Sequence, residues 1–241
     1  MRAMTRLFAA ALAIPLVACH VGGDDSPGIA PSASGSERSY AATGFTAVEL
    51  AGPDDVDVSV GGNYAVSASG DAKTLDRLKI ERRGDTLYVG RRNGIDLGDE
   101  GDVKIHVTLP ALRVAKLAGS GDLAIDRASG PAFDGSIAGS GDLTVGELKV
   151  AAASFSIAGS GNVVAAGDVQ RLAVKIAGSG DVKAERLRAS AADISIAGSG
   201  AVKARVNGPA NVKLLGSGDV DLGPDARCTT KTAGSGSVRC G

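Results

Sequence analysis

The stretch Ile137-Ala-Gly-Ser-Gly-Asp-Leu143 decides the fold, because close copies of it run through the C-terminal half of the chain. Seven Gly-Ser-Gly triplets follow one another at steps of 20, 20, 19, 20, 18 and 18 residues. Repetition at such a period is typical of a solenoid, in which each repeat forms one coil stacked on the previous coil. The triplets begin at Gly119, Gly139, Gly159, Gly178, Gly198, Gly216 and Gly234.

Three ladders of mostly apolar side chains surround the triplets when the repeats are aligned. Between the ladder positions stand mostly polar residues, such as Lys183 and Asp221. Alternation with a period of two is typical of strands with one buried face, whereas a helix would place its apolar residues three and four apart. The ladder before the triplets contains Leu117, Ile137, Ile157, Ile176, Ile196, Leu214 and Thr232. The two ladders after them contain Leu123, Leu143, Val163, Val182, Val202, Val220 and Val238, and then Ile125, Val145, Ala165, Ala184, Ala204, Leu222 and Cys240.

The repeats therefore predict an all-β chain with a single parallel β-helix, or β-solenoid, built from coils of about 20 residues. Each coil is expected to contain two or three short strands, which stack in parallel on their equivalents in neighbouring coils. Glycine suits the corners because the chain turns there with φ values that a Cβ disfavours. The orientation of the repeated serine stays open, since strict alternation places it outside and a corner at the triplet would break that alternation. In both cases its hydroxyl is expected to hydrogen-bond the turn backbone.

The composition is consistent with one domain and gives no sign of a nucleic-acid partner. The chain has 241 residues, 35 glycines, no tryptophan and 3% aromatic residues. Its net charge is −1, whereas proteins that bind nucleic acid usually carry a basic surface.

Residues 1–19 are predicted to be a lipoprotein signal peptide. Two arginines precede a short apolar run, which is too short to span a bilayer. The run ends in Leu16-Val17-Ala18-Cys19, which resembles a bacterial lipobox and implies that Cys19 becomes the lipidated first residue. An ordinary signal peptide with a chance cysteine is the alternative. The residue after the cysteine is His20 rather than an aspartate that would resemble an inner-membrane retention signal, and this favours the outer membrane.

Residues 20–43 are predicted to be a flexible tether between the anchor and the folded domain. They are rich in Gly, Ser, Pro and Asp and poor in apolar residues. The folded domain is expected over residues 44–241, with irregular first coils over 44–116 and the Gly-Ser-Gly repeats over 117–241.

Cys228 and Cys240 are predicted to form a disulfide in the last coil. Cys240 lies on an inward ladder, and Cys228 lies four residues before Thr232, so it shares the same parity. An exported protein meets an oxidising compartment, and a covalent link at the open end of a solenoid would act as a plug. A metal site is the alternative, for which His106 is the only histidine of the folded region.

The N-terminal part of the folded region carries strand patterns in place of the triplets. Alternation runs through residues 56–60, 64–68 and 103–109, and residues 72–78 are expected to form one helical turn. The order Val56-Asp-Val-Ser-Val-Gly-Gly-Asn-Tyr64, Leu87-Tyr-Val89 and Val107-Thr-Leu-Pro-Ala-Leu112, followed by Gly-Ser-Gly-Asp repeats, resembles the DUF2807 family of auto-transporter adhesins with a head GIN domain. The resemblance covers about residues 45–241. It implies a right-handed parallel β-helix on a bacterial envelope protein.

The residue after each triplet forms a row that is acidic in most coils. Stacked carboxylates can bind calcium, but Asn162 and Ala201 interrupt this row, and aspartate is also a common turn residue that bonds its own backbone. We therefore expect no metal site. The row contains Asp122, Asp142, Asn162, Asp181, Ala201, Asp219 and Ser237.

No catalytic or cofactor-binding residue is predicted. A polysaccharide hydrolase or lyase on a β-helix would need clustered carboxylates, often beside aromatic sugar platforms. Phe133 and Phe155 fit the inward register instead, and His106 faces outward from its strand. With one histidine in the folded region, no Ser/His/Asp set is visible.

We predict a lipid-anchored envelope protein, without enzymatic activity, that acts as an adhesion, binding or scaffold module. Its expected partners are the membrane, through Cys19, and a glycan or protein ligand on the outer faces of the solenoid. The alternatives are a glycan-active β-helix enzyme and a periplasmic partner in envelope signalling. A clustered acidic groove would favour the enzyme, and a face with mixed Lys, Arg and Asp would favour binding.

Overall fold

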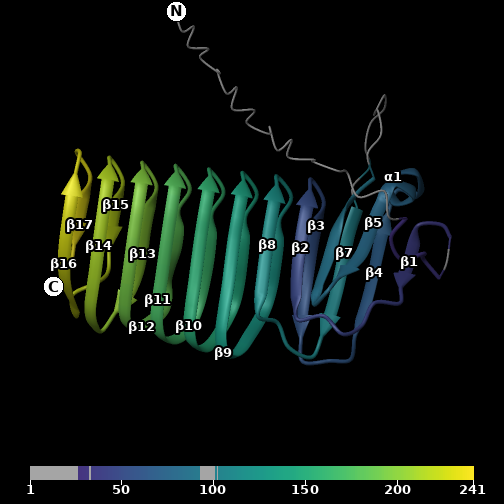
Figure 1. The fold of residues 1–241 in the computed structure, drawn as a ribbon, viewed down its shortest axis with the longest axis horizontal. Coiled ribbons are helices and arrows are strands. Elements are labelled where there is room, and N and C mark those ends of the chain that lie inside the picture. Colours follow the sequence, from purple (N-terminus) through teal and green to yellow (C-terminus); the bar gives the residue numbers. More distant parts are fainter. Residues whose placement is uncertain (1–26, 33, 93–100, 102) are drawn as a thin grey trace, which may run out of the picture.

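The structure is a β-solenoid, as the repeats predict. The computed structural model describes residues 27–32, 34–92, 101 and 103–241, and is 70% strand and 3% helix. Its coils stack side by side for about 6 turns, from the N-terminal cap to the yellow C-terminal strands at the opposite end of Figure 1. Among the described residues, no helix is long and apolar enough to cross a membrane.

Four long strands form the central coils, and each of them follows the chain through most of one turn. They pair in parallel, so that equivalent residues of successive repeats lie side by side. The pairing divides each coil into three segments, for example residues 143–145, 147–150 and 152–159. We call the corresponding sides of the solenoid the first, second and third face. The four strands are β9 (Leu123–Gly139), β10 (Leu143–Gly159), β11 (Val163–Gly178) and β12 (Val182–Gly198).

Shorter strands continue the same faces in the last coils. Each of them pairs in parallel with the coil before it. The first face continues through β13 (Ala201–Val206), β15 (Asp219–Asp221) and β17 (Ser237–Arg239), and the third through β14 (Gly208–Gly216) and β16 (Ala226–Ala233). The last two residues of β13 pair with the second face.

The predicted ladders fill the interior. Ile157 and Ile176, from the ladder before the triplets, are only 2% and 3% exposed. Phe133 and Phe155 also face inward, with ring centroids 6.2 Å apart in an edge-to-face contact. Thr232 departs from its ladder and is exposed, because no further described strand pairs with β16 on its outer side.

The geometry of the corners explains both glycines of the triplet and the orientation of the serine. All seven serines are exposed, so they point away from the core. The first glycine of a triplet has a positive φ, +137° at Gly159, which side chains rarely adopt. The second glycine lies directly against the previous coil: a Cβ on Gly161 would be 2.1 Å from the carbonyl oxygen of Gly141. Only glycine lets successive corners approach this closely.

The N-terminal coils do not stack in the order of the sequence. The first coil along the chain consists of β2 (Ala47–Gly52) and β3 (Asp55–Val60). It lies between the coil of β6 (Thr86–Arg91) and β7 (Val103–Leu109) and the coil that begins with β8 (Val114–Gly119). The chain therefore forms this inner coil, moves outward to build the cap, and then returns past it to start the repeats.

The turn between β2 and β3 occupies the place of a Gly-Ser-Gly corner. Its sequence is Gly52-Pro53-Asp54-Asp55, and Gly121 stacks on it, donating its N–H to the carbonyl oxygen of Gly52. A degenerate first repeat therefore precedes the seven triplets.

An antiparallel cap closes the N-terminal end. The strand β4 (Ala65–Gly70) pairs with β7, β1 (Glu37–Tyr40) with β4, and β5 (Leu78–Arg83) with β6. The predicted helical turn is α1 (Ala72–Arg77), which joins β4 to β5. Charged contacts hold the cap: Arg38 donates to Asp76 over 2.6 Å, and Arg91 binds the buried Asp54 through two hydrogen bonds of 2.6 and 2.8 Å.

The tether predicted over residues 20–43 is wrong at its C-terminal end. Residues 37–40 form β1, and Tyr40 and Ala42 are buried in the core. The chain contacts the folded domain still earlier in the sequence, because Ile29 donates its N–H to the carbonyl oxygen of Ile80 over 2.7 Å. Two buried side chains and the strand pairing with β4 are enough to fix a segment whose composition alone indicates a coil. Residues 1–26, with the predicted signal peptide and Cys19, lie outside the described residues.

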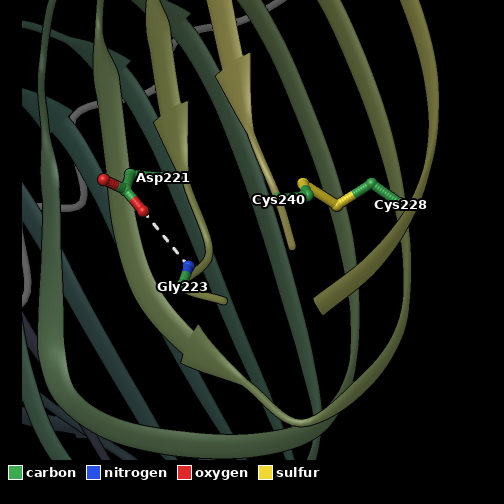
Figure 2. Close-up of a disulfide and its surroundings, with 4 residues drawn as sticks. All are labelled: Asp221, Gly223, Cys228 and Cys240. Atoms are coloured by element: carbon green, nitrogen blue, oxygen red, sulfur yellow. Dashed lines mark hydrogen bonds between the residues drawn. A yellow bond between two sulfur atoms is a disulfide. The ribbon is translucent and has the colours of Figure 1, made fainter. Parts of the chain in front are cut away.

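The predicted disulfide closes the C-terminal end. Cys228 of β16 and Cys240, which follows β17, are bonded across the last coil with their Cα atoms 6.0 Å apart (Figure 2). Both pack, half-buried, against the core. Nearby, the Asp221 carboxylate accepts a hydrogen bond of 3.1 Å from the Gly223 N–H, which orders the turn after β15. The disulfide thus ties the first face to the third at the open end of the solenoid.

We expect replacement of both bonded cysteines by serine to lower the free energy of unfolding by about 2–4 kcal/mol. The bond joins residues 12 apart in the sequence, so its removal increases the entropy of the unfolded chain. Urea unfolding of the oxidised and the double-serine proteins measures the difference. Complete alkylation of both thiols in native protein without reductant would contradict the bond itself.

Candidate functional site

A shallow groove runs along the second face, parallel to the axis of the solenoid. It crosses β10, β11 and β12, reaches the connection between β13 and β14, and has a volume of about 550 Å³. Because side chains alternate along each strand, each central coil contributes one outward residue to a charged wall and one to an uncharged wall. The residue between them points into the core and forms the floor with its backbone. The charged wall contains Lys149, Asp168 and Arg188, the floor Val150, Val169 and Ala189, and the uncharged wall Ala151, Gln170, Ser190 and Asn207.

A second hollow of about 190 Å³ extends the groove toward the C-terminus. It shares Arg188 and Asn207 with the first hollow and adds Arg205 to the charged wall and Val206 to the floor. It ends against the turn after β15, at Pro224 and Asp225 in a further coil. The whole groove therefore spans five coils, roughly 20 Å at the usual spacing of strands.

A contraction of one coil brings two arginines together in this groove. Ala184 pairs with Ala204, and Arg188 pairs with Arg205. In β12 three residues lie between Ala184 and Arg188, whereas in β13 Ala204 and Arg205 are consecutive. The coil of β13 and β14 thus omits part of the second face, in agreement with the step of 18 residues between Gly198 and Gly216. Arg205 consequently lies directly beside Arg188 on the charged wall.

The charged wall consists of ion pairs that remain exposed to solvent. Asp168 accepts hydrogen bonds of 2.6 and 3.1 Å from Arg188, and Lys149 lies 2.6 Å from Glu147. The hydrogen bond from Arg188 lowers the pKa of Asp168, and the same bond raises the pKa of Arg188. The hydrogen bond from Lys149 lowers the pKa of Glu147. Arg188 is 74% exposed, so its pair with Asp168 adds little to stability and stays accessible to a ligand.

The acidic row after the triplets connects successive coils, rather than each aspartate bonding its own turn as predicted. The Asp122 carboxylate accepts the backbone N–H of Asp142 at 2.9 Å, and Asp142 accepts that of Asn162 at 2.8 Å. Asn162 and Asp181 continue the series in the next two coils. The carboxylates are therefore used as acceptors for the backbone. Among the described residues, no group of three or more His, Cys, Asp or Glu side chains could hold a metal ion.

We expect calcium to leave the melting temperature of the protein unchanged. The apolar ladders close the core without an ion, whereas a ligand that bound only the folded form would raise the midpoint. Melts in millimolar calcium and in chelator should coincide. Asp142→Ala removes the acceptor of the Asn162 N–H and should cost about 0.5–1.5 kcal/mol equally in both buffers. A midpoint that rises by several degrees with calcium, and loses that rise in Asp142→Ala, would contradict the expectation.

The structure also places a serine and an aspartate beside His106, which the sequence analysis missed. Ser67 of β4 and Asp57 of β3 are its register partners, and Asp57 Oδ2 lies 3.6 Å from His106 Nδ1. His106 faces outward and is 53% exposed. A nucleophilic serine needs a hydrogen bond to its histidine and donors for an oxyanion, and in the described part of the chain no hydrogen bond joins Ser67 to His106.

Comparison with known families agrees with this architecture. The family DUF2807, described as "Putative auto-transporter adhesin, head GIN domain", matches residues 44–226. The chain belongs to the DUF2807 family. The matched residues include the chain from β2 onward, with β4, α1 and β5 of the cap, and the entire groove, so the groove is part of the DUF2807 domain. No curated protein matches the chain.

Several solved structures share the fold of this DUF2807 domain. A "putative adhesin" from Bacteroides fragilis has a TM-score of 0.77 at 19% identity, with 85% of this chain and 95% of the other covered. A "putative lipid binding protein" from Parabacteroides distasonis has a TM-score of 0.68 at 22% identity, with 87% and 98% covered. A "putative adhesin" from Parabacteroides merdae has a TM-score of 0.63 at 17% identity, with 85% and 95% covered. At these identities the likeness shows the fold alone.

Proposed function

We propose that this DUF2807 protein is a non-catalytic binding module of the bacterial cell envelope, anchored by a lipid on Cys19. The observation that carries the proposal is the groove of the second face, which crosses five coils and presents mixed Lys, Arg and Asp side chains. Extended surfaces built from stacked repeats suit long ligands, because each coil adds an equivalent set of contacts. The adhesin names of the family and of two structural neighbours support the same class of function.

The carboxylates of the groove argue against glycan hydrolysis. Among the described residues that line it, Asp168 and Asp225 are the carboxylates, and Arg188 hydrogen-bonds the first of them. They belong to coils three strand spacings apart, roughly 14 Å along the axis. The two carboxylates of a glycosidase stand at most about 9.5 Å apart. The spacing of these two carboxylates supports binding, and Glu147, the carboxylate near Asp168, is held by Lys149.

The lipid anchor is tested by mass spectrometry of Cys19 and by partition between a detergent phase and an aqueous phase. We expect the full-length wild type, expressed in a bacterium that processes lipoproteins, to carry acyl chains on Cys19 and to enter the detergent phase. Cys19→Ser should remain in the aqueous phase. The matched control is the double variant Cys228→Ser and Cys240→Ser, which keeps Cys19 and should partition like the wild type. A wild type without acyl chains on Cys19 would contradict the anchor.

Adhesion is tested on intact cells. We expect an added protease to cleave the solenoid on the cell surface, and the same cells to retain members of a panel of glycans and matrix proteins in proportion to its expression. If the solenoid is cleaved only after the outer membrane is broken, adhesion is wrong and a periplasmic partner in envelope signalling takes its place.

A further inference from the structure

We propose that the groove binds a linear acidic glycan, with the carboxylate of one uronate unit held between Arg188 and Arg205. This inference rests on the proposed binding function and names the class of its ligand.

The two arginines form an arrangement that a bound anion would stabilise. Arg188 and Arg205 are register partners on neighbouring strands, and like charges directly opposite each other are destabilising. Asp168 binds Arg188 from the opposite side, in the coil before it. The Nε–H of Arg205 donates to the backbone carbonyl of Glu185 over 3.0 Å, which fixes the guanidinium without neutralising it. An orientated guanidinium offers its remaining N–H groups as a fork that matches a carboxylate.

The rest of the groove suits the body of a sugar chain. The side chains of Val150, Val169, Ala189 and Val206 beneath its floor are at most 6% exposed and belong to the core, so a sugar chain would contact mainly the two walls. The amides of Gln170 and Asn207 and the hydroxyl of Ser190 can exchange hydrogen bonds with sugar hydroxyls. These side chains recur at the strand spacing of roughly 4.8 Å, which is close to the length of one sugar unit in an extended chain. A polymer of similar units therefore meets one residue of each wall in every central coil.

Other polymers fit the groove less well. A peptide strand would need free backbone groups, whereas β10, β11 and β12 are paired in parallel ladders on both sides. Single-stranded nucleic acid would need aromatic platforms for its bases, and no aromatic residue stands among the described residues that line the groove. A uronate polymer requires only the charged, amide and hydroxyl groups that are present on the two walls.

The test is calorimetric titration of the mature full-length protein with hexagalacturonate, hexamannuronate and a hyaluronan hexasaccharide. We expect at least one to bind saturably, and its methyl ester, which lacks the charge, to bind at least about tenfold more weakly. Arg188→Gln and Arg205→Gln should each weaken binding about 10- to 150-fold, as expected for the loss of hydrogen bonds to a charged group. The matched control is Arg127→Gln, an exposed arginine of the same face that is paired with Asp126 and lies outside the groove. It should change the affinity less than twofold.

A second readout separates ligand binding from structure. Arg205→Gln removes a like-charge neighbour of Arg188 and one exposed hydrogen bond to the Glu185 carbonyl, two effects of opposite sign, so the ligand-free variant should melt close to the wild type. A clear fall in its melting temperature would assign Arg205 to the fold and overturn its role in binding. Failure of all three hexasaccharides to bind, equal binding of the methyl ester, or binding of inorganic phosphate alone would also overturn the inference. Retention of a protein ligand from the adhesion panel, with none of these glycans bound, would overturn the ligand class and leave the binding function intact.

Discussion

Gly159→Ala is expected to unfold the protein or to lower its free energy of unfolding by more than about 4 kcal/mol. A Cβ at this position would lie 2.2 Å from the carbonyl oxygen of Gly139 in the previous coil. That carbonyl cannot retreat, because it accepts the N–H groups of Ser160 and Gly161 at 3.0 and 3.2 Å. The new side chain would therefore separate two coils in the middle of the stack. Circular dichroism and urea unfolding measure the loss.

The matched control for this change is Gly130→Ala. Gly130 has nearly the same backbone angle, with φ of +131° against +137° at Gly159, but nothing lies within 4 Å of its added Cβ. Only the backbone strain remains there, which costs of order 1–3 kcal/mol. Equal losses at the two glycines would show that the corners do not pack against each other as described.

Ile157→Asp is expected to cause a loss of similar size, about 4 kcal/mol or more, for a different reason. The side chain lies between the equivalent residues Ile137 and Ile176 of the neighbouring coils. Since Ile157 is only 2% exposed, a carboxylate there would be buried with no partner. Lys183→Ala, at an exposed position of the first face, should change the free energy of unfolding by under about 0.5 kcal/mol. Equal effects at the two positions would mean that the inward register is wrong.

The repeated half of the fold could be predicted because its signal is local and periodic. An inward position of a stacked coil meets its own equivalents above and below, so the same apolar preference recurs in every repeat. Alignment of the repeats correctly predicts that Ile157 and Ile176 face the core. The shared inward parity of Cys228 and Cys240 correctly predicts their disulfide. Phe133 was likewise assigned to the interior.

The N-terminal arrangement could not be predicted, because its pairings join distant parts of the chain. Asp55 accepts the N–H of Asp122, 67 residues away, as the first member of the acidic row. Its corner contains Pro53 and Asp54 in place of Ser and Gly, so alignment on the triplets does not detect it. The strand at residues 37–40 could not be predicted for a similar reason, since its pairing partner is the distant strand β4.

The groove was signalled in the sequence only by the uneven steps between triplets. A shortened repeat shows that some face is contracted, but only the pairing shows that Arg205 moves beside Arg188. The orientation of the triplet serine likewise depends on the contact between neighbouring coils. Its outward orientation follows from how closely Gly161 approaches Gly141, a distance that alternation alone does not give.

The central claim is that this DUF2807 solenoid holds a polymer along its coils without cleaving it. The most direct measurement is to let the mature full-length protein retain each binding polymer of the panel, elute it, and size it by mass spectrometry. We predict that the polymer is recovered at its original length, and that the double variant Arg188→Gln and Arg205→Gln no longer retains it. Shortened fragments, or retention that the double variant leaves unchanged, would contradict the claim.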